Sequence, residues 1–198
     1  MKFIGITGGV GAGKSAVLDY MATKPGVRVM LADEIAHELM EPGTDCYEQI
    51  RQAFPEHDIY KEDGYFDRIK LAKVIFSDGN RRARMNGIVH PAVKAYVIAE
   101  AKRERQEGKL ALLVLEAALL IEEHYDEICD ELWYIYTREE IREARLMESR
   151  GYSREKVQQI FSSQLKGAED RKHCSVVIDN NEGLEEMQRQ IDAAVCAI

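Results

Sequence analysis

Short apolar runs alternate along this chain with longer stretches in which apolar residues recur at helical spacing. Runs rich in Val, Ile, Leu and Tyr are typical of β-strands. They lie at Lys2–Thr7, Val27–Leu31, Leu110–Leu115, Leu132–Tyr136 and Ser175–Ile178. Strands that alternate with helices predict an α/β fold with a parallel, doubly wound sheet, in which ligands bind at the carboxyl ends of the strands.

Two stretches interrupt this alternation. From about Asp33 to Gly108 the pattern is mostly helical, and a single crossover between parallel strands does not need so many residues. This stretch therefore predicts a helical insertion. A second insertion is expected at about residues 138–171, so that the core comprises about residues 1–32, 109–137 and 172–198 of a single chain.

The second insertion contains two predicted helices. Thr137 and Glu140 have the spacing of a capping box, which predicts that Thr137 caps the first helix. Gly151 is suited to end that helix, and Ser153 to cap a second one that extends to about Leu165.

Three arginines lie on one face of the first of these helices. Arg138, Arg142 and Arg145 have i, i+4, i+7 spacing, which is that of neighbours on a helix surface. Two helices with a basic face, placed between the last two strands, predict a lid over an anionic ligand. The alternative is a solvated face whose arginines pair with nearby glutamates at little energetic benefit.

The strongest local motif follows the first strand directly. The segment Gly8–Ser15 fits the pattern GxxxxGK[ST] without a gap, which indicates a phosphate-binding loop. Its four glycines allow backbone N–H groups to point at an anion, and Lys14 supplies a positive charge for the β- and γ-phosphates. The hydroxyl of Ser15 is placed to ligate Mg²⁺, and the following helix directs its positive end at the same phosphates.

Composition narrows the class of protein. The formal net charge of −8 and the pI near 5.3 argue against a general nucleic-acid or membrane-surface binder, because such partners require a basic face. The four cysteines are widely spaced and include no CxxC pair, so neither a disulfide framework nor a zinc site is expected. The first strand begins at once, without a leader, and the longest apolar run is too short to span a membrane. We therefore expect a soluble, cytoplasmic protein.

A phosphate-binding loop alone does not separate a kinase from a GTPase. The NKxD and DxxG motifs of small GTPases are absent from the sequence, which argues against a GTPase. A phosphotransferase often needs a carboxylate that receives the proton of the acceptor hydroxyl. Asp33, just after the second strand, suits that role, although an aspartate here would equally cap the following helix.

Several motifs, in this order along almost the whole chain, resemble the dephospho-coenzyme A kinase family. They are Thr7–Ser15, Ala32–His37, Glu41–Thr44, His90–Pro91, Leu119–Glu122 and Val177–Asn180. The resemblance implies transfer of the γ-phosphoryl group of ATP to the ribose 3′-hydroxyl of dephospho-CoA, which is the last step of CoA synthesis. It also implies a P-loop nucleotide-binding core, a helical substrate domain at about residues 33–108 and a helical lid at about residues 138–171.

The resemblance implies a role for individual residues. Asp33 is the expected base or orienting group, and Arg145 is the lid arginine that contacts the transferring phosphates, with Arg142 and Arg150 as weaker candidates. Asn180 is expected to hold adenine through its backbone, although it also suits an ordinary turn. The ATP-binding loop is formed by Gly11, Ala12, Gly13, Lys14, Ser15 and Ala16.

Two further positions stay open. Glu116, at the end of the third strand, suits either Mg²⁺-bound water or substrate, or a structural role. His90 either shapes the substrate site or, before Pro91, marks a helix start. The remaining alternatives for the whole protein are another small-molecule kinase of the nucleoside-monophosphate type and a non-catalytic ATP sensor.

Overall fold

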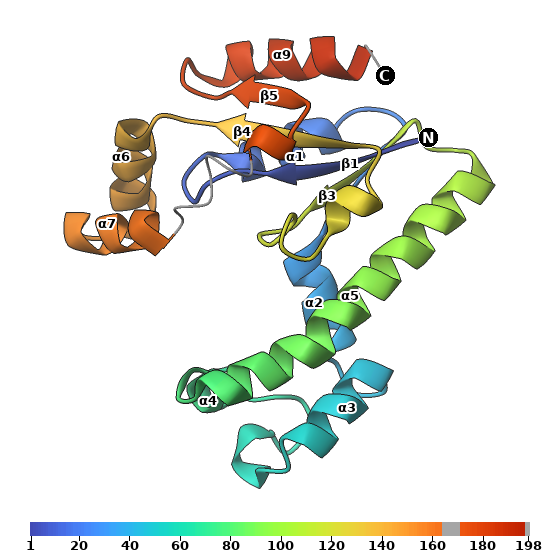
Figure 1. Ribbon diagram of the computed structural model, residues 1–198, viewed down its shortest axis with the longest axis vertical. Helices are drawn as coiled ribbons and strands as arrows, with labels where there is room; N and C mark the ends of the chain where they lie inside the picture. Colours follow the sequence, from blue (N-terminus) through green and yellow to red (C-terminus); the bar gives the residue numbers. More distant parts are fainter. Residues whose placement is uncertain (164–170, 197–198) are drawn as a thin grey trace. The chain divides into compact units, whose positions relative to one another are not determined.

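The computed structural model of the chain describes residues 1–163 and 171–196. Five strands form one sheet in the order β2-β3-β1-β4-β5, and the pairs β1–β3, β1–β4 and β4–β5 are parallel (Figure 1). The strands are β1 (Lys2–Thr7), β2 (Val27–Leu31), β3 (Leu112–Glu116), β4 (Glu131–Tyr136) and β5 (Val176–Asp179). The predicted α/β class and parallel sheet are confirmed, and each predicted strand agrees with an observed one to within two residues.

The centre of the sheet is apolar on both faces. Phe3 and Ile4 of β1 are completely buried, and so are Leu113 of β3 and Trp133 of β4. Helix α1 (Lys14–Ala22) contributes buried side chains to this core, and α9 (Leu184–Cys196) contacts both α1 and β5. Near-continuous apolar strands of this kind are typical of a parallel sheet with covered faces.

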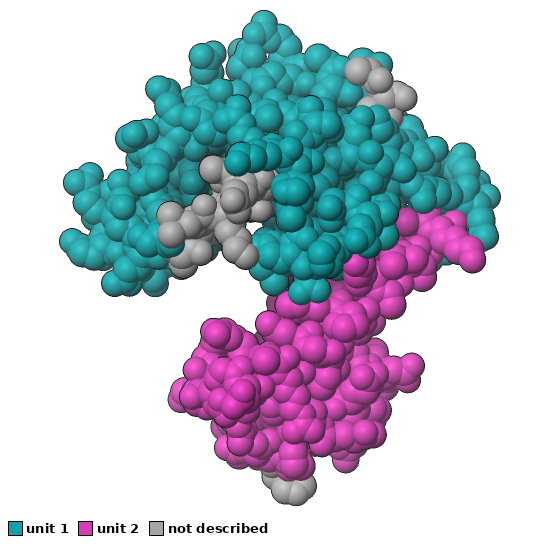
Figure 2. Space-filling model, viewed as in Figure 1, with its two compact units in different colours: residues 1–30, 103–198 teal, residues 31–102 magenta. Residues whose placement is uncertain are grey.

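The chain forms two compact units (Figure 2). The first unit contains residues 1–30 and 103–198 and holds the sheet; the second contains residues 31–102. The further division into core, helical substrate domain and lid stays a prediction.

The first unit also contains the two helices expected of a lid. They are α6 (Glu139–Arg150) and α7 (Arg154–Ser163), and they lie beyond the carboxyl ends of the strands (Figure 1). Gly151 ends α6 in the left-handed conformation, with a φ of 61°, and the hydroxyl of Ser153 accepts a hydrogen bond from the amide of Lys156 at 3.3 Å. Both predicted boundaries are confirmed, whereas Leu165 lies outside the described residues.

The predicted capping box is wrong. Arg138 occupies the N-cap of α6 and makes no side-chain capping bond, whereas the hydroxyl of Thr137 donates to the Ala12 carbonyl. Thr137 is 4% exposed, and its hydrogen-bond partners come from segments distant in sequence. A tertiary contact has therefore taken the hydroxyl that the local pattern assigned to the helix.

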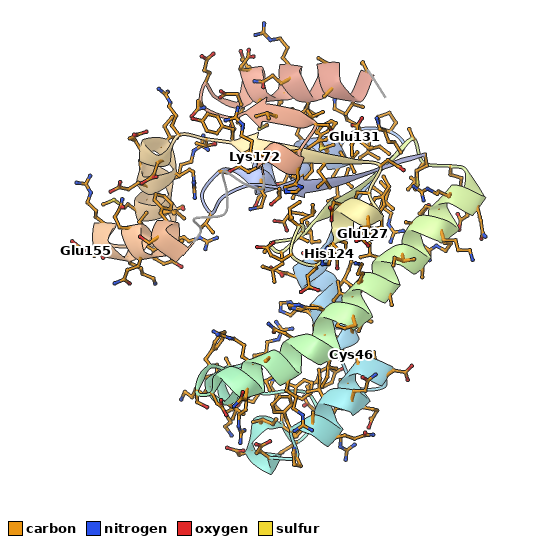
Figure 3. The ribbon with its side chains drawn as sticks, viewed as in Figure 1. Cys46, His124, Glu127, Glu131, Glu155 and Lys172 are labelled. Carbon is orange, nitrogen blue, oxygen red and sulfur yellow. The ribbon has the colours of Figure 1, made fainter. Side chains whose placement is uncertain are left out.

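The second unit is helical around its own small core. Its helices are α2 (Ala32–Leu39), α3 (Asp45–Ala53), α4 (Arg68–Phe76), the part of α5 (Gly79–Glu107) up to residue 102, and the 3₁₀ turn η1 (His57–Ile59). Tyr47 and Phe66 pack with ring centroids 5.1 Å apart, and Cys46, which precedes Tyr47 on α3 (Figure 3), is also buried. Among the described residues of this unit, the only β-type pairing is one isolated bridge between Tyr60 and Phe66. This agrees with the predicted helical insertion.

The expectation that His90 marks a helix start is wrong, because α5 runs through Pro91. Proline removes one backbone hydrogen bond from a helix interior and usually kinks it. Here Val89, Val93 and Val97, at i, i+4, i+8 spacing on both sides of the proline, are all buried. We attribute the continuity of the helix to this apolar stripe, because its burial offsets the lost bond.

No helix in the described part of the chain is long and apolar enough to cross a membrane.

Candidate active site

The loop Gly8–Gly13 connects β1 to α1, and Lys14 is the first residue of the helix. Gly13 is the N-cap and adopts a φ of 86°, a left-handed conformation that favours glycine. A Cβ atom at this position would lie 2.3 Å from Nδ2 of Asn180. Both the conformation and the close approach require glycine, and the strand–loop–helix context that the motif predicted is present.

Lys14 turns back over its own loop. Its Nζ donates a hydrogen bond to the Gly8 carbonyl at 2.9 Å and lies 3.6 Å from Oε1 of Glu116. Glu116 ends β3 and is paired in register with Ile6 of the adjacent β1. Glu116, whose role the sequence leaves open, therefore lies beside the lysine of the phosphate-binding loop. Ser15 follows in the first turn of α1, with an exposed side chain.

The carboxyl ends of β1 and β4 lie at the topological switch point of the sheet, where the direction of the connections reverses. The chain leaves β1 toward β2 on one side, and leaves β4 toward β5 on the other. In open α/β sheets, ligands bind outside the carboxyl ends of the strands at such a switch point. The phosphate-binding loop follows β1 at this point, and Thr137 follows β4.

Three side chains converge on one carbonyl of the loop. The Ala12 oxygen accepts hydrogen bonds from Oγ1 of Thr137 at 2.9 Å, from Nδ2 of Asn180 at 2.9 Å and from Nη1 of Arg145 at 3.4 Å. Thr137 and Asn180 are each 4% exposed. Sequence reasoning missed this contact of Thr137, because the sequence does not show that the strand before Thr137 lies next to β1.

Arg142 holds a second carbonyl of the same loop. Its Nε donates to the Val10 oxygen at 2.8 Å, and its guanidinium lies over the ring of Phe161 at 4.4 Å from the centroid. Burial lowers the pKa of Arg142 below its ordinary value. The side chain thus connects α6, α7 and the loop.

The interpretation of these arginines as a solvated face is wrong for Arg142 and Arg145. Both are half-buried against loop carbonyls, and Nη2 of Arg145 also donates to the Asn180 oxygen at 3.0 Å. Glu143, a glutamate of the same helix, pairs instead with Arg154 at 2.6 Å. Arg138 binds Asn181, and Arg150 is exposed at the end of α6.

The side chain of Asn180 forms a hydrogen bond to the phosphate-binding loop. Its amide nitrogen atom Nδ2 binds Ala12, and its backbone N–H donates to the Tyr136 oxygen at 2.8 Å. The residue is buried directly after β5, so it is not an ordinary exposed turn residue. Its predicted contact with adenine stays a prediction.

Asp33 and His90 belong to the second unit. Asp33 is exposed in the first turn of α2, but the N-cap is Leu31, which makes no side-chain capping bond. The interpretation of Asp33 as the helix cap is therefore wrong. His90 lies half-buried within α5. Their predicted roles toward a substrate stay predictions.

The model of one protein family, described as dephospho-CoA kinase, matches residues 2–186. The chain belongs to the dephospho-CoA kinase family. A dephospho-CoA kinase of Symbiobacterium thermophilum is 36% identical over 194 residues, which cover 98% of this chain and 80% of that protein. The predicted family and function are confirmed, and with them an ATP-dependent phosphotransferase.

Solved structures of similar proteins support the fold. The crystal structure of TT1252 from Thermus thermophilus superposes with a TM-score of 0.79 at 30% identity, covering 100% of this chain and 97% of that one. A dephospho-CoA kinase from Campylobacter jejuni superposes with a TM-score of 0.75 at 20% identity, covering 99% and 96% of the two chains. Together with the loop motif, these likenesses confirm a P-loop α/β fold.

Proposed function

We propose that this chain transfers the γ-phosphoryl group of ATP to the ribose 3′-hydroxyl of dephospho-CoA, giving CoA and ADP. The observation that carries the proposal is the complete phosphate-binding loop at the switch point of the sheet, in a chain whose family model covers residues 2–186. Backbone amides at a helix start form an anion site, which suits a polyphosphate.

The loop and α6 supply the groups that would bind and stabilise the phosphates. The loop residues 11–16 would bind the phosphates of ATP, and Lys14 would exchange its contacts with Gly8 and Glu116 for a phosphate oxygen. Arg145 would stabilise charge on the transferring group, because a preorganised cation is most effective where charge develops in the transition state. Arg142 would stabilise the loop through its hydrogen bond to the Val10 carbonyl.

Mg²⁺ is expected to accompany ATP in this reaction. Ser15, in the first turn of α1, carries the hydroxyl that the loop motif offers to the ion. No group of three or more His, Cys, Asp or Glu side chains suited to a metal occurs among the described residues. We therefore propose that the ion is held by Ser15, the nucleotide phosphates and water, as is common for Mg²⁺.

Asp33 is the group that we propose to orient or deprotonate the 3′-hydroxyl. It is exposed, it follows β2 by two residues, and it is not required as a helix cap. A positioned carboxylate in this role contributes typically 10²–10⁴-fold to the rate.

We further propose that the protein acts in the cytoplasm, where both substrates would be supplied.

The decisive experiment measures ADP release with saturating Mg·ATP and dephospho-CoA, AMP, CMP or adenosine as the acceptor. Turnover should occur with dephospho-CoA and should exceed that with the other acceptors by at least about 100-fold in kcat/KM, which corresponds to nearly 3 kcal/mol of discrimination. Mass spectrometry of the product should show CoA. Turnover with a nucleoside monophosphate would support the nucleoside-monophosphate kinase alternative, and ATP binding without turnover would support the sensor.

A further inference from the structure

We infer that Thr137 and Asn180 are positioning residues that set the orientation of the Ala12–Gly13 peptide in the phosphate-binding loop. The inference rests on the proposed function only in that the loop binds nucleotide phosphates. It assigns to Thr137 a role that its local sequence pattern does not suggest, and to the Asn180 side chain a role separate from any contact with adenine.

The geometry of a trans peptide carries the first step. The C=O and the following N–H of a planar trans peptide point in opposite directions. The Ala12 oxygen is directed at Thr137 and Asn180, both at 2.9 Å. The Gly13 N–H therefore points the opposite way, where it is available to an anion over the loop.

The conformation of the loop explains why this peptide has to be held by side chains from outside the loop. Gly13 has a φ of 86°, and glycine populates several backbone regions with little preference, so the peptide before it is free to rotate unless it is held. Each donor comes from a different strand end, Thr137 after β4 and Asn180 after β5. Both strands belong to one parallel ladder, with Tyr136 in register with Asp179, which fixes the two donors relative to each other.

Because the site is buried, the orientation of the Ala12–Gly13 peptide depends on the Thr137 hydroxyl. Thr137 and Asn180 are each 4% exposed, so water does not readily replace a lost donor. Thr137 Oγ1 also lies 3.4 Å from the Asn180 oxygen, which Arg145 contacts at 3.0 Å. The two residues thus connect the orientation of the loop peptide to the arginine of α6.

The test compares Thr137→Val, which keeps the shape and removes the hydroxyl, with Thr137→Ser, which restores it. We expect Thr137→Val to weaken ADP binding about five- to tenfold in calorimetry, as one or more hydrogen bonds in a buried site allow. It should also reduce the rise in melting temperature that saturating ADP produces, and leave the KM for dephospho-CoA within twofold. Thr137→Ser should recover most of the ADP affinity.

Ser175→Ala is the matched control. The Ser175 hydroxyl also donates to a backbone carbonyl of β4, that of Leu132 at 3.3 Å, but it precedes β5 and lies at the opposite end of the same strand pair. Because Ser175 is exposed, Ser175→Ala should change the melting temperature little and leave the affinity for ADP unchanged.

Asn180→Leu provides a second route if Thr137→Val fails to fold. It should also weaken ADP binding, and combined with Thr137→Val it should show a non-additive effect, because both side chains act on the same carbonyl. A Thr137→Val protein that is folded and binds ADP within twofold of the wild type would overturn the inference, as would an effect of the same size in Ser175→Ala. Failure of the wild type to bind ADP would instead refute the proposed function.

Discussion

Lys14, the first residue of α1, forms an ion pair with Glu116, the last residue of β3, with Nζ and Oε1 3.6 Å apart. Each side chain is only about one-fifth exposed, so the two charges interact through a partly desolvated medium. This contact and the Gly8 carbonyl hold the lysine over the loop. Glu116 therefore has a structural partner. Its role toward Mg²⁺-bound water or substrate stays a prediction.

Lys14→Ala should lower kcat by roughly 10²–10⁴-fold, because it removes a preorganised positive charge from the transition state. The melting temperature should change little, since the lysine contacts the loop and Glu116 rather than the core. Lys24→Ala is a suitable control, because Lys24 carries the same charge but pairs with Asp192. A Lys14→Ala enzyme that retains more than about a third of the wild-type kcat would contradict the assignment.

Arg145→Ala should lower kcat at least about tenfold while changing the KM for ATP less than about threefold, because a lid arginine contacts the phosphates fully only in the closed state. Arg145→Lys keeps the charge but loses the planar fork that contacts Ala12 and Asn180, so it should recover only part of the rate. Steady-state kinetics with each substrate varied would provide both constants. If the variants differ from the wild type only in melting temperature, Arg145 has a structural role.

The cysteines should differ strongly in reactivity. Burial raises the pKa of the Cys129 thiol to about 12, and burial also raises the pKa of Cys46. Because the thiolate is the reactive form, iodoacetamide at pH 8 should modify exposed Cys196 first, half-buried Cys129 much more slowly, and buried Cys46 only after addition of denaturant. Peptide mapping by mass spectrometry measures this order. Rapid modification of Cys129 in the folded protein would contradict the raised pKa of its thiol.

The strands and the loop could be predicted because their signals are local. The apolar runs placed β1 and β2 to the residue, and the glycine pattern placed the loop between β1 and α1. Thr137 was misassigned because a capping box and a strand-end hydroxyl have the same appearance in sequence. The Thr137 hydroxyl reaches Ala12 only because β4 pairs beside β1.

The continuity of α5 and the burial of the arginines were missed for a related reason. A proline favours a helix boundary locally, but a valine stripe that packs on both sides of Pro91 outweighs it. Likewise, the charge pattern of α6 equally suits a solvated face. The contacts of Arg142 with Val10 and Phe161 depend on where the loop and α7 lie, which no window of sequence contains.

Asp33 provides the sharpest test of the chemistry. The N-cap of α2 is Leu31, so Asp33 contributes to that helix only through its charge in the first turn, an effect of about 0.3–1 kcal/mol. Asp33→Asn keeps the shape and removes the charge. We expect a folded protein that binds ATP normally and transfers phosphate at least about 100-fold more slowly, because a positioned carboxylate contributes 10²–10⁴-fold.

Glu34→Gln is the matched control for Asp33→Asn, because Glu34 is the neighbouring exposed acid in the same turn of α2. It should lose the same favourable interaction with the helix dipole and should retain the wild-type kcat. The comparison requires kcat at saturating dephospho-CoA and melting curves on the same samples. If Asp33→Asn turns over within about threefold of the wild type, the 3′-hydroxyl proton leaves by another route, such as water or Glu116. If both variants lose activity equally, the charge of the α2 turn as a whole matters, and Asp33 has no special position toward the hydroxyl.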